Sequence, residues 1–237
     1  AAFTAIELSR LLSGKTSFDL ILCPLTGILC GGLVGIWISP PVNQLIEQLG
    51  NWINWGTQQQ PFLMGMVVSI LMGIAIIFPI NTLALGSMLG LSGLAAGAAT
   101  IGCCCSMVGM AVASYQENGF SGLLSIGAGT PLFLLPNVLK NPLLLLPSII
   151  SSAILGPVSV FIGKMQNSSL GSGLGTMGLA GQITTWETMI TVESPQIVFF
   201  KILLLHFILP GVLTLFITNG MRRLNFIKSQ DMLLCSM

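Results

Sequence analysis

The sequence predicts an all-α protein that is embedded in a membrane, and three observations support this. No Asp, Glu, Lys, Arg or His occurs between Gln48 and Gln116. Of the 237 residues, 53% are hydrophobic and only 6% are charged, whereas soluble domains carry about 25% charged residues. Apolar runs of the length that a helix needs to cross a bilayer recur along the chain. An ionised side chain at the centre of such a helix costs about 2.5–3.5 kcal/mol, so the uncharged stretches indicate folding in lipid.

The first predicted span is Leu20–Ile38, which we expect to end at Pro40 and Pro41. Its glycines recur at four-residue spacing, which either leaves one helix face flat enough for close packing or reflects only the tolerance of Gly in membrane helices. In Val42–Trp55, apolar residues at helical spacing alternate with Asn, Gln and Glu, and two tryptophans lie near the end. This pattern predicts an amphipathic helix in the membrane interface over residues 42–55.

The next two spans contain helix-breaking or small residues. Phe62–Leu83 is interrupted by Pro79, which frees a backbone carbonyl, and such a break is tolerated in a membrane only against protein or water. It is either a kink packed by a neighbour or part of a substrate-lining surface. Leu85–Ala113 is rich in Gly, Ala and Ser, which predicts a helix packed inside the protein, with a broken section near Gly102.

Two clear spans, Leu143–Gly163 and Ile197–Thr218, lie in the second half of the chain. Two shorter runs, Phe120–Leu135 and Ser168–Gln182, either cross the membrane or form re-entrant hairpins, so we expect about six crossings. The Gly-rich segment 168–182 either lines a cavity with its backbone amides and carbonyls or is a flexible loop. Because the chain begins at Ala1 without Met, we also expect further helices upstream.

Basic residues outside the spans predict an orientation. Six crossings with both ends in the cytoplasm leave only Lys164 clearly outside, in agreement with the positive-inside rule. The net charge of +1 gives no sign of a nucleic-acid partner. The basic residues that this arrangement places inside are Arg10, Lys15, Lys140, Arg222, Arg223 and Lys228.

Ionisable residues at membrane depth are candidate functional groups. His206 lies in the last span and Glu193 at its entrance, so an imidazole and a carboxylate could together bind hydroxyl groups of a solute. Alternatively, Glu193 is a solvated loop residue and His206 bonds a carbonyl. The consecutive cysteines Cys103, Cys104 and Cys105 have no nearby His, so we expect them to be packing residues rather than metal ligands. No motif predicts a catalytic residue or a cofactor.

Several motifs run in order through most of the chain. They resemble the EIIC-type permeases of the bacterial phosphotransferase system, in the subgroup that includes the perfringolysin-regulator-like membrane proteins. The matching stretches are Met64–Met66, Leu91–Thr100, Gly102–Cys104, Met107–Gly109, Ser114–Gly119, Pro136–Pro142, Ala153–Pro157 and Gly175–Gln182.

This resemblance implies a carrier in the bacterial cell membrane, surrounded by lipid, that binds a sugar or polyol between helices and re-entrant hairpins. Soluble IIA and IIB proteins would carry out phosphoryl transfer, and such carriers usually form homodimers. The Gly-Ile-Thr-Glu motif of glucose-type permeases is missing. The alternative function is a membrane sensor that binds a solute or partner without transporting it. The motifs imply five residues of the sugar cavity, which are Asn118, Asn137, Asn141, Thr176 and Gln182.

Overall fold

The computed structural model describes residues 6, 10, 19–228 and 230–234. Within this part of the chain the regular elements are all helices, which confirms the all-α prediction. The chain divides into two compact units, residues 1–48 and 49–237, and each is described by itself. Lys15, which we predicted to lie on the cytoplasmic side, is not among the described residues.

Helix α2 (Asp19–Gln59) provides most of the described part of the first unit. The predicted end at Pro40 and Pro41 is wrong, because the helix continues through both prolines. A proline within a helix removes one hydrogen bond and bends the axis without always ending it, and a bend between Trp37 and Ser39 accompanies the pair. The segment predicted to lie in the interface, residues 42–55, is therefore part of this longer helix, and its depth in the membrane remains a prediction.

The second unit is built around three tightly packed helices, α3 (Pro61–Ala75), α5 (Gly93–Cys104) and α9 (Leu146–Phe161). Small residues allow this packing, since a Cβ on Gly102 would lie 1.9 Å from the carbonyl oxygen of Ser69. The Ser69 hydroxyl in turn donates to the carbonyl oxygen of Ser152, at 2.7 Å. Nearly all of α5 is buried, which confirms the prediction that the Gly- and Ala-rich run packs inside the protein.

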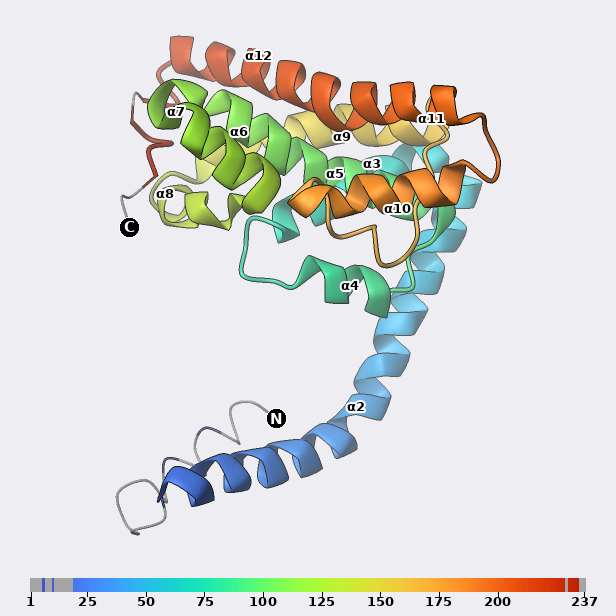
Figure 1. The fold of residues 1–237 in the computed structure, drawn as a ribbon, viewed down its shortest axis with the longest axis vertical. Coiled ribbons are helices and arrows are strands. Elements are labelled where there is room, and N and C mark those ends of the chain that lie inside the picture. Colours follow the sequence, from blue (N-terminus) through green and yellow to red (C-terminus); the bar gives the residue numbers. More distant parts are fainter. Residues whose placement is uncertain (1–5, 7–9, 11–18, 229, 235–237) are drawn as a thin grey trace. The chain divides into compact units, whose positions relative to one another are not determined.

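Two long helices extend this centre, and each contains a π-helical turn. Helix α5 continues through the π-helical turn η1 (Cys105–Gly109) into α6 (Met110–Ala113) as one helix, so the break predicted near Gly102 is wrong. The second long helix lies along α6 and α9 (Figure 1). It is formed in order by α11 (Pro195–Ile202), η6 (Leu203–Ile208) and α12 (Leu209–Arg223).

A sharply bent helix pair lies between these long helices in the sequence. Between the helical runs Tyr115–Gly129 and Pro131–Lys140 the helix axis bends by 120°. Pro131 disfavours the helical conformation of the residue before it, and Thr130 is accordingly extended, with φ −153° and ψ 138°. The bend is that of a broken span or a re-entrant loop, the alternatives predicted for Phe120–Leu135. Its parts are α7 (Tyr115–Leu124), η2 (Ser125–Gly129), η3 (Pro131–Leu134) and α8 (Leu135–Lys140).

The Gly-rich segment 168–182 forms turns up to Thr176. It packs against α4 (Thr82–Met88), where a Cβ on Gly173 would lie 2.0 Å from the carbonyl oxygen of Thr82. The Thr82 hydroxyl donates to the carbonyl oxygen of Gly173, at 2.6 Å. A buried side chain therefore satisfies the Gly173 carbonyl of this non-helical backbone, and whether the segment is re-entrant or a loop stays a prediction. The segment ends in η5 (Met177–Leu179) and α10 (Ala180–Met189).

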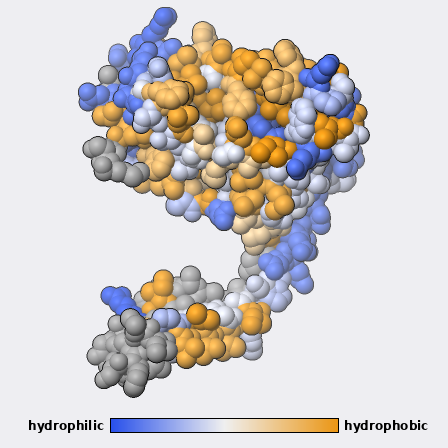
Figure 2. Space-filling view, viewed as in Figure 1, coloured by the Kyte–Doolittle hydropathy of each residue, from blue (hydrophilic) through white to orange (hydrophobic). Residues whose placement is uncertain are grey.

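The described residues contain three helices that are long and apolar enough to cross a membrane, or up to five if each of two bent pairs is one span. This is fewer than the expected six, because α3 has only 15 residues before the chain turns ahead of Pro79, and segment 168–182 forms turns. Figure 2 shows apolar side chains over much of the visible face of residues 49–237. The three candidate spans are Gly93–Ala113, Pro142–Phe161 (η4, Pro142–Leu145, with α9) and Pro195–Arg223.

Candidate functional site

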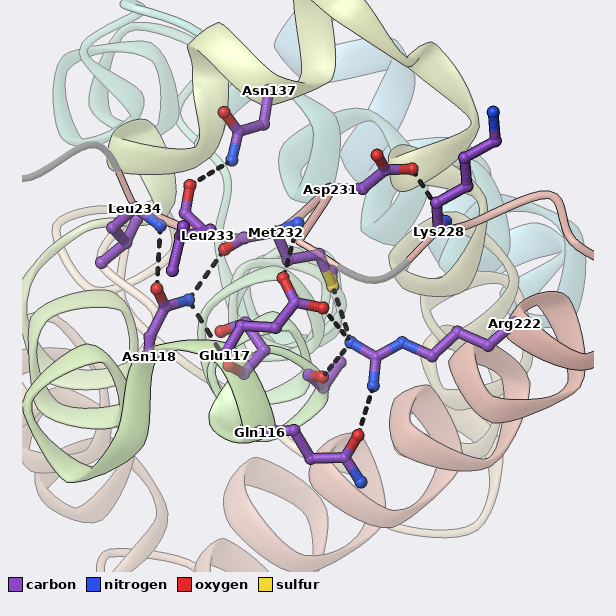
Figure 3. A network of polar contacts seen from close by, with 12 residues as sticks. Gln116, Glu117, Asn118, Asn137, Arg222, Lys228, Asp231, Met232, Leu233 and Leu234 are labelled. Carbon is purple, nitrogen blue, oxygen red and sulfur yellow. Dashed lines mark hydrogen bonds and ion pairs between the residues drawn. The ribbon is translucent and has the colours of Figure 1, made fainter.

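Asn118 and Asn137 hold the segment that follows α12, which we call the C-terminal segment (residues 226–228 and 230–234; Figure 3). The Nδ2 of Asn118 donates to the carbonyl oxygen of Met232, at 2.7 Å, while its Oδ1 accepts from the backbone N–H of Leu234, at 2.8 Å. The Nδ2 of Asn137 donates to the carbonyl oxygen of Leu233, also at 2.7 Å. Both side chains therefore bind main-chain groups of the C-terminal segment.

Asn141 binds the same segment closer to α12. Its Nδ2 donates to Oδ2 of Asp231, at 3.0 Å, and to the carbonyl oxygen of Phe226, at 3.2 Å. The same Asp231 oxygen accepts from the backbone N–H of Lys228, at 2.9 Å. These contacts fold the C-terminal segment into a turn against the end of α8.

A partly buried ion pair joins α7 to α12 beside these amides. The Arg222 guanidinium lies 2.7 Å from Oε1 of Glu117, and the two side chains are 17% and 8% exposed. The other Glu117 oxygen accepts from the backbone N–H of Met232, at 2.8 Å. Arg222 also donates to Oε1 of Gln116, at 2.9 Å, and to the carbonyl oxygen of Ala113, at 3.2 Å.

A local break in α7 follows Glu117 and Asn118 directly. Gly119 has φ 59° and ψ −157° within an otherwise helical run, a conformation that glycine adopts without the steric cost of a Cβ. The chain therefore changes direction immediately after these two side chains. Glu117 and Asn118 lie before this break, and the rest of α7 leads through η2 to the bend at Thr130.

A cavity of about 620 Å³ lies beside this network. Its polar lining comes from a carboxylate, an amide and two serines, and its apolar lining from α8, η3 and the C-terminal segment. The hydroxyls of Ser121 and Ser125 hydrogen-bond no other described residue. The lining residues are Glu117, Asn118, Ser121, Gly122, Ser125, Leu132, Phe133, Pro136, Leu233 and Leu234.

Gln182 and His206 form a second polar group in the interior. The Nε2 of Gln182 lies 3.2 Å from Nδ1 of His206 and 3.6 Å from the sulfur of Cys104. His206 is fully buried in the π-helical turn η6, and Gln182 is 7% exposed. Oε1 of Gln182 and Nε2 of His206 have no hydrogen-bond partner among the described residues.

A comparison with family models assigns the chain to a protein family. The family model described as "Phosphotransferase system, EIIC" matches residues 1–234. The chain belongs to this family. Neither a curated protein nor a solved structure matches it. Together with its apolar helices, the family identifies a multi-pass membrane protein and a permease component of a sugar phosphotransferase system, with IIA and IIB proteins as partners.

Of the seven predicted site residues of this EIIC protein, only Asn118 lines the cavity. The two not yet described, Thr176 and Glu193, bind elsewhere. The Thr176 hydroxyl donates to the carbonyl oxygen of Gly127 and so ties the Gly-rich segment to η2. Glu193 pairs with Lys201, at 2.6 Å, and both side chains are about a quarter exposed, at 25% and 23%. Glu193 and His206 therefore have different partners in this structure, and their joint binding of a solute stays a prediction.

Glu117 and Arg222 are the site residues of the EIIC protein that sequence reasoning missed. Arg222 was assigned only to the orientation, and Glu117 only to a matching motif. A usable signal was present, since Glu117 is the first charged residue after the uncharged stretch and precedes Asn118 directly. No group of three His, Cys, Asp or Glu in the described part of the chain is placed to hold a metal ion.

Proposed function

We propose that this EIIC protein binds its sugar in the cavity beside Asn118 and carries it across the bacterial cytoplasmic membrane for phosphorylation by a soluble IIB protein. The cavity itself is the observation that supports this proposal most directly. Its volume of about 620 Å³ lies within the range of about 300–1,000 Å³ that is usual for small-molecule sites.

The lining of the cavity suits a sugar. The Glu117 carboxylate accepts hydrogen bonds, the Asn118 amide both donates and accepts, and the serine hydroxyls do either. A sugar presents alternating hydroxyl donors and acceptors together with apolar C–H faces. Phe133 and Leu132 supply apolar surface for those faces. A few polar groups among apolar ones can therefore both orient a sugar and exclude water.

Basic residues support a cytoplasmic opening of this cavity. Arg222 and Arg223 end α12, Lys228 belongs to the C-terminal segment, and Lys140 ends α8. The positive-inside rule places such residues on the cytoplasmic side. A sugar held in this cavity would then lie on the side of the membrane where a phosphorylated IIB protein is found.

The test is a binding titration of the purified protein with a panel of hexoses, hexitols and disaccharides. Ser121→Ala and Ser125→Ala remove hydroxyls that bond no other described residue, so the fold should persist. We expect each to raise the Kd of the best-bound sugar about 5- to 10-fold, the loss of one hydrogen bond of roughly 1 kcal/mol or slightly more. Ser87→Ala, at an exposed position of α4 away from the cavity lining, is the control and should leave Kd unchanged. Unchanged Kd in both cavity variants would place the sugar elsewhere.

A membrane sensor would bind the sugar in this same site but would not transport it across the membrane. Uptake of the best-bound sugar into proteoliposomes that also hold the soluble phosphotransfer proteins separates the two functions. Binding without uptake would favour the sensor. The proposal includes the subgroup with the perfringolysin-regulator-like proteins and a homodimer, and the mass of the detergent-solubilised protein tests the homodimer.

A further inference from the structure

We propose that residues 232–234 act as a built-in competitor of the sugar, so that the C-terminal segment must leave the cavity wall before sugar binds. This inference rests on the proposed sugar site. It assigns the C-terminal segment a regulatory role, because the docked segment and the bound sugar would use the same side-chain atoms of Glu117 and Asn118.

The first support is that these atoms are already occupied. Both polar atoms of the Asn118 amide are bonded to the C-terminal segment, one to the carbonyl of Met232 and one to the N–H of Leu234. One Glu117 oxygen accepts from the N–H of Met232 and the other is paired with Arg222. The docked segment therefore takes up part of the hydrogen-bonding capacity of the strongest polar groups of the cavity lining, and that part is not open to sugar hydroxyls (Figure 3).

The second support is the chemistry of the contacts. Glu117, Asn118 and Asn137 bind only main-chain N–H and C=O groups of residues 232–234. The peptide N–H and C=O groups of this segment offer alternating donors and acceptors, as the hydroxyls of a sugar do. An amide and a carboxylate can therefore hydrogen-bond either of them. The same wall can therefore accept either occupant.

The third support is that the C-terminal segment can leave without melting a helix. Within residues 230–234, the described main-chain hydrogen bonds are two short turn bonds, from Asp231 to Lys228 and from Leu233 to Gln230. The segment is anchored by the buried side chains of Ile227 and Met232 and by the hydrogen bonds with Glu117, Asn118 and Asn137 described above. Leu233 and Leu234 line the cavity directly. Because residues 230–234 form turns and irregular backbone, they can open locally while the helices stay folded.

A permanent wall is the competing interpretation, and it predicts effects of the opposite sign. If residues 232–234 only complete the cavity, loosening them would weaken sugar binding, and bound sugar would protect their amides. If they compete, loosening them strengthens binding, because the apparent Kd falls as the binding-competent fraction rises. The direction of the change in Kd, or in the exchange rate of these amides, therefore separates the two interpretations.

The first measurement compares Met232→Ala with Phe226→Ala. Met232→Ala removes one buried anchor and leaves every sugar-facing side chain intact, while Phe226→Ala shortens a half-exposed side chain of the same segment. With the best-bound sugar of the panel, we expect Met232→Ala to lower Kd by roughly threefold or more and Phe226→Ala to leave it unchanged. A higher Kd in Met232→Ala would overturn the inference.

The second measurement needs no variant and covers the case in which Met232→Ala does not fold. Hydrogen exchange of the wild-type peptide that contains Met232 and Leu234 is followed with and without the same sugar at saturation. Competition predicts faster exchange of these two amides when sugar is bound, and slower or unchanged exchange contradicts it. If no sugar of the panel binds any variant, the proposed function itself fails and the competitor role fails with it.

Discussion

The two polar groups of this protein differ in how their hydrogen-bonding capacity is met. Around Asn118, amide and carboxylate atoms are paired with an irregular segment beside a cavity. Around His206, two polar atoms are buried in the interior without a partner in the described part of the chain. A ligand can replace a docked segment, whereas a sealed pair offers no exchangeable partner. Accessibility of the partner, rather than burial of the polar residue, therefore distinguishes the better sugar site.

The largest effect is expected from the ion pair that supports the Asn118 network. Arg222→Ala leaves the partly buried Glu117 carboxylate without its cation, and breaking such a pair costs about 3–5 kcal/mol. We expect a loss of this order in the free energy of unfolding, measured by denaturant in detergent. The neighbour Arg223 is exposed, and Arg223→Ala should change it by less than about 0.5 kcal/mol. Equal losses in both variants would show that the pair does not stabilise the network.

An intermediate effect is expected from the sealed pair. Gln182→Met leaves Nδ1 of His206 without its partner, and an unpaired buried polar group costs about 1–3 kcal/mol. The double variant Gln182→Met with His206→Leu removes both polar groups, so we expect it to recover part of that loss in the free energy of unfolding. Sugar affinity measured on the same samples should stay within about twofold of the wild type. A tenfold rise in Kd would move the sugar site to Gln182, as the sequence motifs imply.

The sequence was sufficient for the fold class and for the packing of α5, because both follow from composition. Glycine, alanine and serine in a charge-free run leave close helix packing as the main source of stability in lipid. The end of the first span could not be predicted in the same way. Pro40 and Pro41 each cost a hydrogen bond, but a bend at that point lets α2 continue to Gln59.

The candidate site was predicted only in part, because its contacts join distant parts of the chain. Asn118, Asn137 and Asn141 were selected from motifs, and the structure brings all three to the C-terminal segment. Asn118 and Met232 are 114 positions apart, and no local pattern encodes such a pairing. The same holds for Glu117 and Arg222, which are also far apart in the sequence, so that composition alone cannot predict their ion pair.

The smallest effect is expected at Glu193, which lies outside both polar groups. Its pair with Lys201 is partly exposed, and exposed pairs contribute about 0–1 kcal/mol and weaken with salt. Glu193→Gln should therefore lower the melting temperature slightly at low salt and leave it unchanged at high salt. Lys201→Met is the matched partner variant, and the two changes together should add little to either one, because each removes the same interaction. Sugar affinity should not change in either variant. A strong loss of affinity in Glu193→Gln alone would instead give this carboxylate a role in the sugar site that its contact with Lys201 does not account for.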